Sequence, residues 1–198
     1  MRSIGRAGAI ALFACLSQWF PPPLRAETPP PSPRRAILYR ATPIVNAVYP
    51  AVVSRAMRGA KRSIKIVMFS ISAGYSPRNP MSTLMEECIG AARRGVRVTV
   101  IADFCDHADG NLYAINARTL EYLNENGVET YFDHPKTKTH DKVVLIDDAT
   151  LIVGSHNWSK AAMSRNVEAS IMITSSPPDP AFARYVEEIK SACLPSRI

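Results

Sequence analysis

Short apolar runs separated by polar residues fill the second half of the chain, as they do in strands that pair in a sheet. The segment from Thr139 to Asp147 contains the apolar run 143–146 between polar residues, which predicts a strand. A turn at 147–150 and the apolar run 151–153 predict an antiparallel partner that folds back on the first strand. The pattern at 166–173 predicts another strand. This region is therefore expected to belong to a β-sheet.

Helical and strand periodicities alternate through the rest of the chain, without an internal repeat. Helices are predicted over residues 46–60, 81–94, 112–126 and 180–192, and strands over residues 63–71, 96–102 and 128–132. Glycines stand at or just beyond the ends of the first three helices, at positions 59, 95 and 127. The alternation predicts an α/β fold with a mixed β-sheet flanked by helices on both faces.

The N-terminus has the pattern of a secretory signal. Arg2 and Arg6 precede the uncharged stretch 7–20, which is short for a membrane span. We expect a signal peptide over 1–26, a proline-rich leader over 27–36, and one domain over 37–198. The protein is then periplasmic or secreted. The alternatives are an N-terminal membrane anchor and a lipoprotein signal that uses Cys15.

Charge and cysteines restrict the function little. The net charge of +7 falls to +4 when residues 1–26 leave, because they contain three arginines and no acidic residue. Such an excess suits nucleic acid, an anionic membrane surface or ordinary solubility. The remaining Cys88, Cys105 and Cys193 predict one disulfide and one free thiol, without saying which residues pair. Cys88 lies in an apolar helical pattern and is expected in the core. No Cys/His spacing indicates zinc.

Two residues of the strand over 139–147 carry candidate chemistry. His140 and Lys142 are two apart, so both project to the same side of a strand. Asp147 falls on the other side, at the end of the strand. An imidazole and an ammonium group are thus expected side by side.

Further polar groups follow the apolar run 151–153. Ser155 and Asn157 are again two apart, and Gly154 before them leaves room for a backbone or a ligand to come close. Glu168 is opposite in phase to its apolar neighbours, and such a carboxylate can orient an imidazole. Hydroxyl, amide and ammonium groups together suit a phosphate.

The order of these residues resembles that of the phospholipase D superfamily. His140-x-Lys142-x4-Asp147, followed by Gly154-Ser155-x-Asn157 and by Glu168, is similar to its HxKxxxxD signature. The resemblance is to the small, single-motif bacterial endonucleases in particular, and it covers roughly residues 37–193.

This resemblance implies a mechanism. His140 would attack phosphorus and form a phosphohistidine, which water resolves. Lys142, Ser155 and Asn157 would hold the nonbridging oxygens. Glu168 would accept the other N–H of the imidazole. Asp147 belongs to the signature and to the catalytic set, although its side of the strand favours a structural role.

The resemblance also implies a partner. Superfamily members protonate the leaving oxygen with a second histidine from a second copy of the motif. This chain has one copy, so a homodimer that brings two His140 residues into one shared site is expected. Neither a cofactor nor a metal is expected.

Six residues near the motif are candidates for binding substrate. Four are basic and would contact phosphates outside the reacting one; the other two follow Ser155, one able to contact substrate and one to stack on bases. The alternatives are a solvated surface for the basic residues and packing for the tryptophan. The candidates are Lys136, Lys138, His156, Trp158, Lys160 and Arg165.

The sequence thus predicts a metal-independent phosphodiesterase, a nonspecific endonuclease that cleaves DNA or RNA. One alternative is a phospholipase D-type phospholipid hydrolase or transferase. No exposed amphipathic helix is evident after the leader, so a stable membrane association is not expected. Another alternative is a non-catalytic nucleic-acid-binding module of a secretion or conjugation system.

Overall fold

The computed structural model describes residues 36–72, 80–104 and 110–196. The predicted signal peptide over 1–26 and all but the last residue of the predicted leader over 27–36 lie outside this part of the chain, as does Cys105. Among the described residues, none of the helices has the length and apolar content that a membrane span requires.

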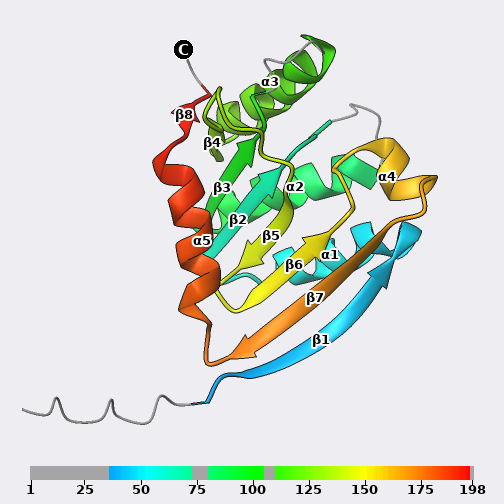
Figure 1. The fold of residues 1–198 in the computed structure, drawn as a ribbon, viewed down its shortest axis with the longest axis vertical. Coiled ribbons are helices and arrows are strands. Elements are labelled where there is room, and N and C mark those ends of the chain that lie inside the picture. The colour runs from blue at the N-terminus through cyan, green and yellow to red at the C-terminus, as the bar shows by residue number, and fades with distance from the viewer. Residues whose placement is uncertain (1–35, 73–79, 105–109, 197–198) are drawn as a thin grey trace, which may run out of the picture. The chain divides into compact units, whose positions relative to one another are not determined.

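A mixed sheet in the order β1-β7-β6-β5-β2-β3-β4-β8 forms the centre of the domain (Figure 1). Strands β2, β3 and β4 run parallel to one another, and every other neighbouring pair is antiparallel. The strands are β1 (Leu38–Val45), β2 (Ser63–Met68), β3 (Arg97–Ala102), β4 (Glu129–Phe132), β5 (Lys142–Ile146), β6 (Thr150–Gly154), β7 (Ala169–Ser176) and β8 (Leu194–Pro195).

The predicted pairing of β5 with β6 is confirmed, with Val143 opposite Val153. Asp147 and Asp148 make the turn between them with φ values of 53° and 57°, a left-handed conformation that aspartate tolerates better than most residues. The strand predicted over 139–147 is shorter than expected, since His140 lies before β5.

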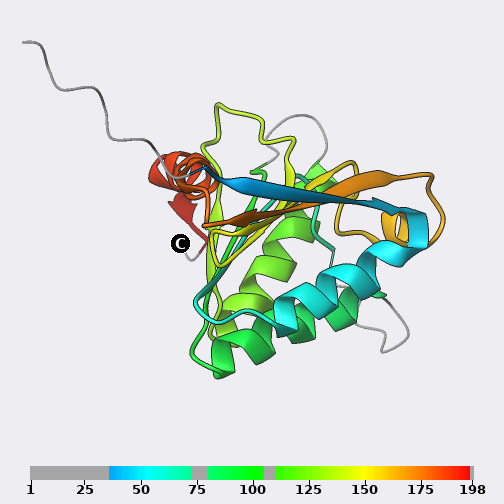
Figure 2. The same cartoon turned by 90° about the horizontal axis from the view of Figure 1, so that it is seen from below.

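Helices cover both faces of the sheet, as predicted. They are the 3-10 helix η1 (Asn46–Val48), α1 (Tyr49–Arg58), α2 (Pro80–Arg93), α3 (Gly110–Glu125), α4 (Lys160–Ser164) and α5 (Pro180–Ser191). Figure 2 shows α1, α2 and α3 on one face and α5 on the other. The α/β fold with a mixed sheet is therefore confirmed.

Two apolar clusters correspond to these two layers. The larger joins helices α1 to α3 to the sheet through residues such as Met57, Leu84 and Leu120. The smaller lies under α5, where Val186 packs with Val143 and Leu145. Since successive residues of β5 alternate between the clusters, Lys142 lies on the face of the larger one.

Neither of the two cysteines in the described residues, Cys88 and Cys193, is part of the expected disulfide. Cys88 is a buried free thiol in the larger cluster, as its apolar surroundings predicted, and burial raises its pKa. Cys193 is also free; its thiol lies 3.2 Å from the carbonyl of Ile189, and burial raises its pKa to about 11.

Candidate active site

Four segments meet at one end of the sheet because of the strand register. Met68, the last residue of β2, lies opposite Lys142, the first residue of β5. At the same end, Gly154 closes β6 opposite Ser170 of β7. The residues just beyond these strand ends therefore gather there, and they include His140, Ser155, Asn157 and Glu168.

His140 and Lys142 lie together, as the sequence predicted. The Lys142 ammonium donates a hydrogen bond of 2.7 Å to the backbone carbonyl of His140. Burial lowers the pKa of Lys142, against the opposing effect of the carboxylates of Asp141, Glu168 and Asp103. The side chain is 8% exposed, whereas His140 is exposed to solvent. The imidazole is thus accessible beside a largely buried cation.

Two buried aspartates hold the residue before His140. The backbone N–H of Thr139 donates to Asp103 at 2.8 Å and to Asp133 at 3.0 Å. Burial raises the pKa of Asp133; hydrogen bonds from Thr139 and Phe104 oppose this, and the Asp103 carboxylate adds to it. This anchor fixes where the chain enters β5, and hence where His140 starts. Sequence reasoning did not identify it, because the three segments meet only in the folded chain.

Glu168 does not make the predicted contact with the imidazole. One of its carboxylate oxygens accepts from the hydroxyl of Ser155, and the other accepts from the amide of Asn166 at 2.9 Å. Burial raises the pKa of Glu168, but these two hydrogen bonds and the proximity of His156 and Lys142 outweigh it, so the pKa is lowered. In this structure Glu168 orients Ser155 rather than His140.

The hydroxyl of Ser155 is therefore already engaged in hydrogen bonds within the chain. This hydroxyl donates a hydrogen bond to Glu168 and accepts one of 3.0 Å from the backbone N–H of Ala169. A phosphate could receive a hydrogen bond from this hydroxyl only after the bond to Glu168 breaks. The predicted phosphate-binding role of Ser155 is therefore indirect in this structure.

The space beside Gly154 is filled by the backbone of the neighbouring strand β7 and by Ser170, so it is not room for a ligand. A Cβ at this position would lie 2.2 Å from the hydroxyl oxygen of Ser170 and 2.4 Å from the carbonyl oxygen of Ala169. Side chains do not approach so closely, so only glycine lets β6 and β7 pair here. This close pairing places Ser155 next to Glu168.

Asn157 occupies the loop that follows. Its side-chain oxygen is buried, and no described residue donates to it. A buried polar atom without a partner costs free energy, so this amide oxygen is suited to a donor from outside the described residues. The loop itself is fixed by the next residue, Trp158, whose backbone N–H donates to Ser70.

Two predicted substrate-binding residues, His156 and Trp158, have structural contacts instead. His156 is fully buried, stacks on Tyr49 with 4.3 Å between ring centroids, and contacts Ser170 and the carbonyl of Asn46. Burial lowers its pKa, against the effects of the Asn46 carbonyl and the Glu168 carboxylate. Trp158 is fully buried and donates to the hydroxyl of Tyr49. Both side chains are buried in this structure, so neither is placed for the substrate contact predicted from the sequence, and Trp158 has the packing role given as its alternative.

Asp147 lies at the other end of β5. Its carboxylate accepts hydrogen bonds of 2.7 to 3.0 Å from the backbone N–H groups of Lys61, Arg62 and Ser63. Burial by itself raises the pKa of Asp147, but these hydrogen bonds outweigh that effect and lower the pKa. In this structure Asp147 therefore has the structural contacts that the strand alternation favoured, and it lies away from the other residues of the predicted catalytic set.

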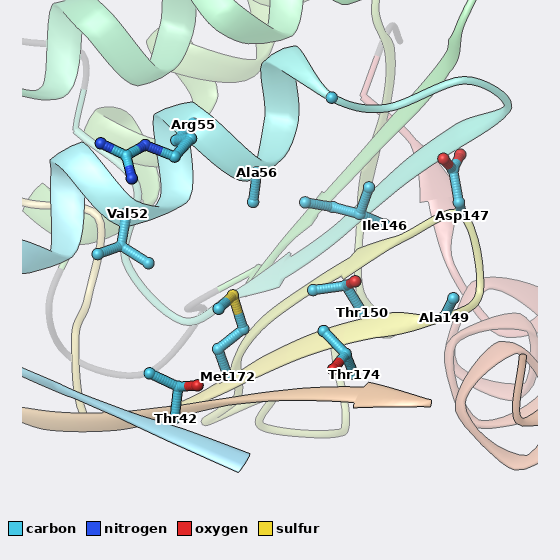
Figure 3. A pocket seen from close by; sticks show the side chains of 11 residues that line it. Thr42, Val52, Arg55, Ala56, Ile146, Asp147, Ala149, Thr150, Met172 and Thr174 are labelled. Carbon is cyan, nitrogen blue, oxygen red and sulfur yellow. The ribbon is translucent and has the colours of Figure 1, made fainter. Parts of the chain in front are cut away.

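A cavity of about 550 Å³ at this other end is separate from the site. It lies between α1 and strands β1, β6 and β7 and is lined mainly by apolar atoms, with Met172, Val52 and Ala56 among its residues (Figure 3). Asp147 also borders it. Since Ile146 and Thr150 line it, it lies at the strand ends opposite to His140.

The four basic candidates remain available for substrate. Lys136 and Lys138 lie in the segment between β4 and β5, and Lys160 and Arg165 lie at the two ends of α4; all four are exposed.

Phe69 was not predicted as a site residue, although its ring contacts the segment 138–142. Within the described part of the chain, no three His, Cys, Asp or Glu side chains are placed to hold a metal ion.

A mixed sheet of this order, with His140, Lys142 and Asn157 at one of its ends, is what the resemblance to the phospholipase D superfamily implies. The family model described as "Cardiolipin synthase, PLD-like domain" matches residues 53–192. This is more than half of the chain, which therefore belongs to this family of the phospholipase D superfamily, and the resemblance noted in the sequence is confirmed.

Individual proteins agree with this assignment. The mitochondrial cardiolipin hydrolase of Homo sapiens is 30% identical over 120 residues, which are 61% of this chain and 42% of that protein. The chain thus spans less than half the length of this curated relative. Nuc of Salmonella typhimurium, a phospholipase D family member, has a similar structure with a TM-score of 0.65 and 23% identity, covering 81% of this chain and 98% of Nuc. NucT of Helicobacter pylori superposes with a TM-score of 0.63 and 19% identity, covering 80% and 99%.

Proposed function

We propose that this protein is a phosphodiesterase that cleaves nucleic acid without a metal ion, through a phosphohistidine on His140. The observation that carries the proposal is the exposed imidazole of His140 beside the largely buried ammonium of Lys142. The imidazole supplies a nucleophile, and the ammonium can stabilise charge on the phosphoryl oxygens, the task that a divalent metal has in many other nucleases.

The reaction has two steps. A ring nitrogen of His140 attacks phosphorus in line, so a P–N bond forms while the P–O bond to the leaving alkoxide breaks. A second imidazole gives its proton to that alkoxide. Water then attacks the phosphohistidine, loses its proton to the second imidazole, and releases the phosphomonoester and free His140. Asn157, whose buried amide oxygen has no donor among the described residues, lies in the loop that completes the site.

The second imidazole would come from a second chain. Val45, Val48 and Val167 are 52%, 52% and 95% exposed. They flank Asn46 and Glu168, which are joined by two hydrogen bonds of 2.9 Å beside the site. Valines exposed to this degree next to a polar site suit an interface, and a twofold axis near them would bring the two sites together. This placement supports the homodimer.

Nucleic acid is the proposed substrate because Lys136, Lys138, Lys160 and Arg165 are exposed on the two segments that flank the motif. These positions suit phosphates on either side of the scissile one. A phospholipid diester is the second candidate, favoured by the family description and by the cardiolipin hydrolase among the relatives. A periplasmic or secreted location, which would follow from cleavage of residues 1–26, remains part of the proposal.

The experiment compares three substrates with and without chelator. The purified protein is incubated with plasmid DNA, RNA and cardiolipin vesicles, each with excess EDTA, and His140→Ala is run alongside. We expect cleavage of nucleic acid that survives EDTA and is absent in the variant. Activity that EDTA removes and magnesium or zinc restores would contradict the mechanism. Turnover of cardiolipin alone would identify the lipid as the substrate.

A further inference from the structure

Phe69 lies against three basic residues of the site, Lys138, His140 and Lys142. It directly follows β2, its backbone N–H donates to the carbonyl of Asp141 at 2.8 Å, and its own carbonyl accepts from the buried Asn116 at 3.0 Å. Asn116 also donates to the carbonyl of Asp103 at 3.0 Å. The backbone of Phe69 is therefore fixed on both sides, while its side chain is only partly buried.

The ring of Phe69 contacts three basic side chains. The imidazole of His140 lies 4.7 Å away between ring centroids, with the planes tilted by 58°. The ammonium of Lys138 is 5.2 Å from the centroid of the Phe69 ring, and that of Lys142 is 5.1 Å from it. These residues are two apart in sequence, so alternate positions of one segment converge on a single ring.

An aromatic ring has a specific effect in this position. Two ammonium groups near one imidazole repel each other, and each is stabilised by the negative face of the ring. An aliphatic side chain of similar size would fill the space but would not attract the cations. The ring thus holds the two ammonium groups against the same side chain that the imidazole of His140 contacts.

We propose that Phe69 is a positioning residue that gathers Lys138 and Lys142 around His140, so that both lysines act on the same phosphate. The proposal rests on the phosphodiesterase function and deepens it: it assigns Lys138 to the reacting phosphate rather than to a neighbouring one. Phe69 acts through the lysines and does not itself touch the reacting atoms.

The first test replaces the ring. Phe69→Leu and Phe69→Met keep an apolar side chain, and Phe69→Tyr and Phe69→Trp keep an aromatic face. We expect the two aliphatic variants to lose about tenfold in kcat on a small diester such as bis(4-nitrophenyl) phosphate, which corresponds to about 1.4 kcal/mol, with a smaller change in KM. The aromatic variants should retain activity. Equal activity of aliphatic and aromatic variants would overturn the proposal.

A matched control is available elsewhere in the fold. Tyr131 of β4 carries the ammonium of Lys190 at 4.9 Å from its ring centroid. Tyr131→Leu removes the same kind of contact from a place outside the site, so kcat should stay unchanged. If Tyr131→Leu and Phe69→Leu lower kcat equally, the effect is a general loss of packing, and the proposal fails.

A double-mutant cycle tests the role of Lys138. If the ring acts through Lys138, then Phe69→Leu combined with Lys138→Ala should lose less than the product of the two single losses. The small diester has only the reacting phosphate, so any effect of Lys138 on its hydrolysis is exerted there. Losses that multiply fully would mean that the ring and Lys138 act independently, which would contradict the assignment.

A readout independent of turnover separates this inference from the proposed function. In proton NMR, the ring current of Phe69 should shift the side-chain CH₂ signals of Lys138 and Lys142 upfield in the wild type. Phe69→Leu should abolish these shifts, and Phe69→Trp should retain them. Absent shifts in an active wild type would overturn the inference alone; present shifts in a protein inactive on every diester would sink the proposed function.

Discussion

Two histidines of the motif region have opposite environments, although both stand beside candidate phosphate ligands in the sequence. The His140 ring is exposed and packs on Phe69, whereas the ring of His156 is buried against Tyr49 with a polar partner for each nitrogen. Substitution should therefore separate activity from stability.

His140→Ala is expected to abolish turnover while the free energy of unfolding changes by less than about 0.5 kcal/mol, because an exposed ring contributes little packing. Urea denaturation and a diester assay on the same sample measure both quantities. Unchanged hydrolysis would exclude His140 as the nucleophile.

His156→Ala should have the reverse effect. It removes a stacked ring and the hydrogen-bond partner of the Ser170 hydroxyl, while the Asn46 carbonyl keeps the backbone N–H of Tyr49, so the free energy of unfolding should fall by about 2–4 kcal/mol. Activity per folded molecule should persist at a temperature well below the midpoint. Wild-type stability combined with lost activity would place His156 back among the substrate-binding residues.

Strand alternation predicted that His140 and Lys142 lie together, because that geometry is local. The burial of His156 was not predictable in this way. Its partners Tyr49 and Asn46 are more than a hundred positions away, and a histidine between Ser155 and Asn157 has a polar neighbourhood in the sequence. The hydrogen bond that Ser155 donates to Glu168 was not predicted for a related reason, because it depends on the close approach of β6 and β7 at Gly154.

Elements buried on at least one face were predicted well from periodicity, and those at the sheet edges were not. β1 was missed because it is an edge strand, in which only Ile44 is buried and which contains Pro43. Its partner β7 begins more than a hundred residues later. β8, with two residues, is too short to leave a pattern.

A charged contact joins α5 to β4 in addition to the apolar cluster, and pH can test what it contributes to stability. Lys190 of α5 pairs with Glu129 of β4 at 3.0 Å. Burial by itself raises the pKa of Glu129. Hydrogen bonds from Tyr131, Thr99 and Lys190, together with the charge of Lys190, outweigh this effect and lower the pKa to about 2. A carboxyl whose folded pKa is depressed adds stability above its unfolded pKa, about 4.3, and loses it as pH falls through the folded value.

Glu129→Gln should therefore be less stable than the wild type at pH 7, and the difference should shrink as pH falls from about 4 towards 2. Urea denaturation over this range measures it. Glu121→Gln, on the exposed surface of α3, is the control and should show no such trend. A difference that stays constant with pH would mean that Glu129 contributes shape rather than charge.

At the scale of the molecule, the proposed dimer predicts how activity responds to dilution with inactive chains. Wild type refolded together with an equal amount of His140→Ala gives about a quarter intact dimers by random assortment, so activity on DNA should fall to about that fraction. Independent chains would keep about half. Val167→Asp, which puts a charge on the exposed apolar surface beside the site, should lower both the dimer fraction and the activity at low protein concentration.

Gly154 has a consequence for how this family can diverge. A Cβ there would strike the backbone carbonyl of Ala169 as well as the side chain of Ser170, and a carbonyl fixed by strand pairing cannot move away. Selection for folding alone therefore keeps the glycine, whatever chemistry the descendant performs. His140, exposed and outside the core, is under no such constraint. If His140 is the nucleophile, a lineage that loses the activity is expected to retain the glycine and to let the histidine drift.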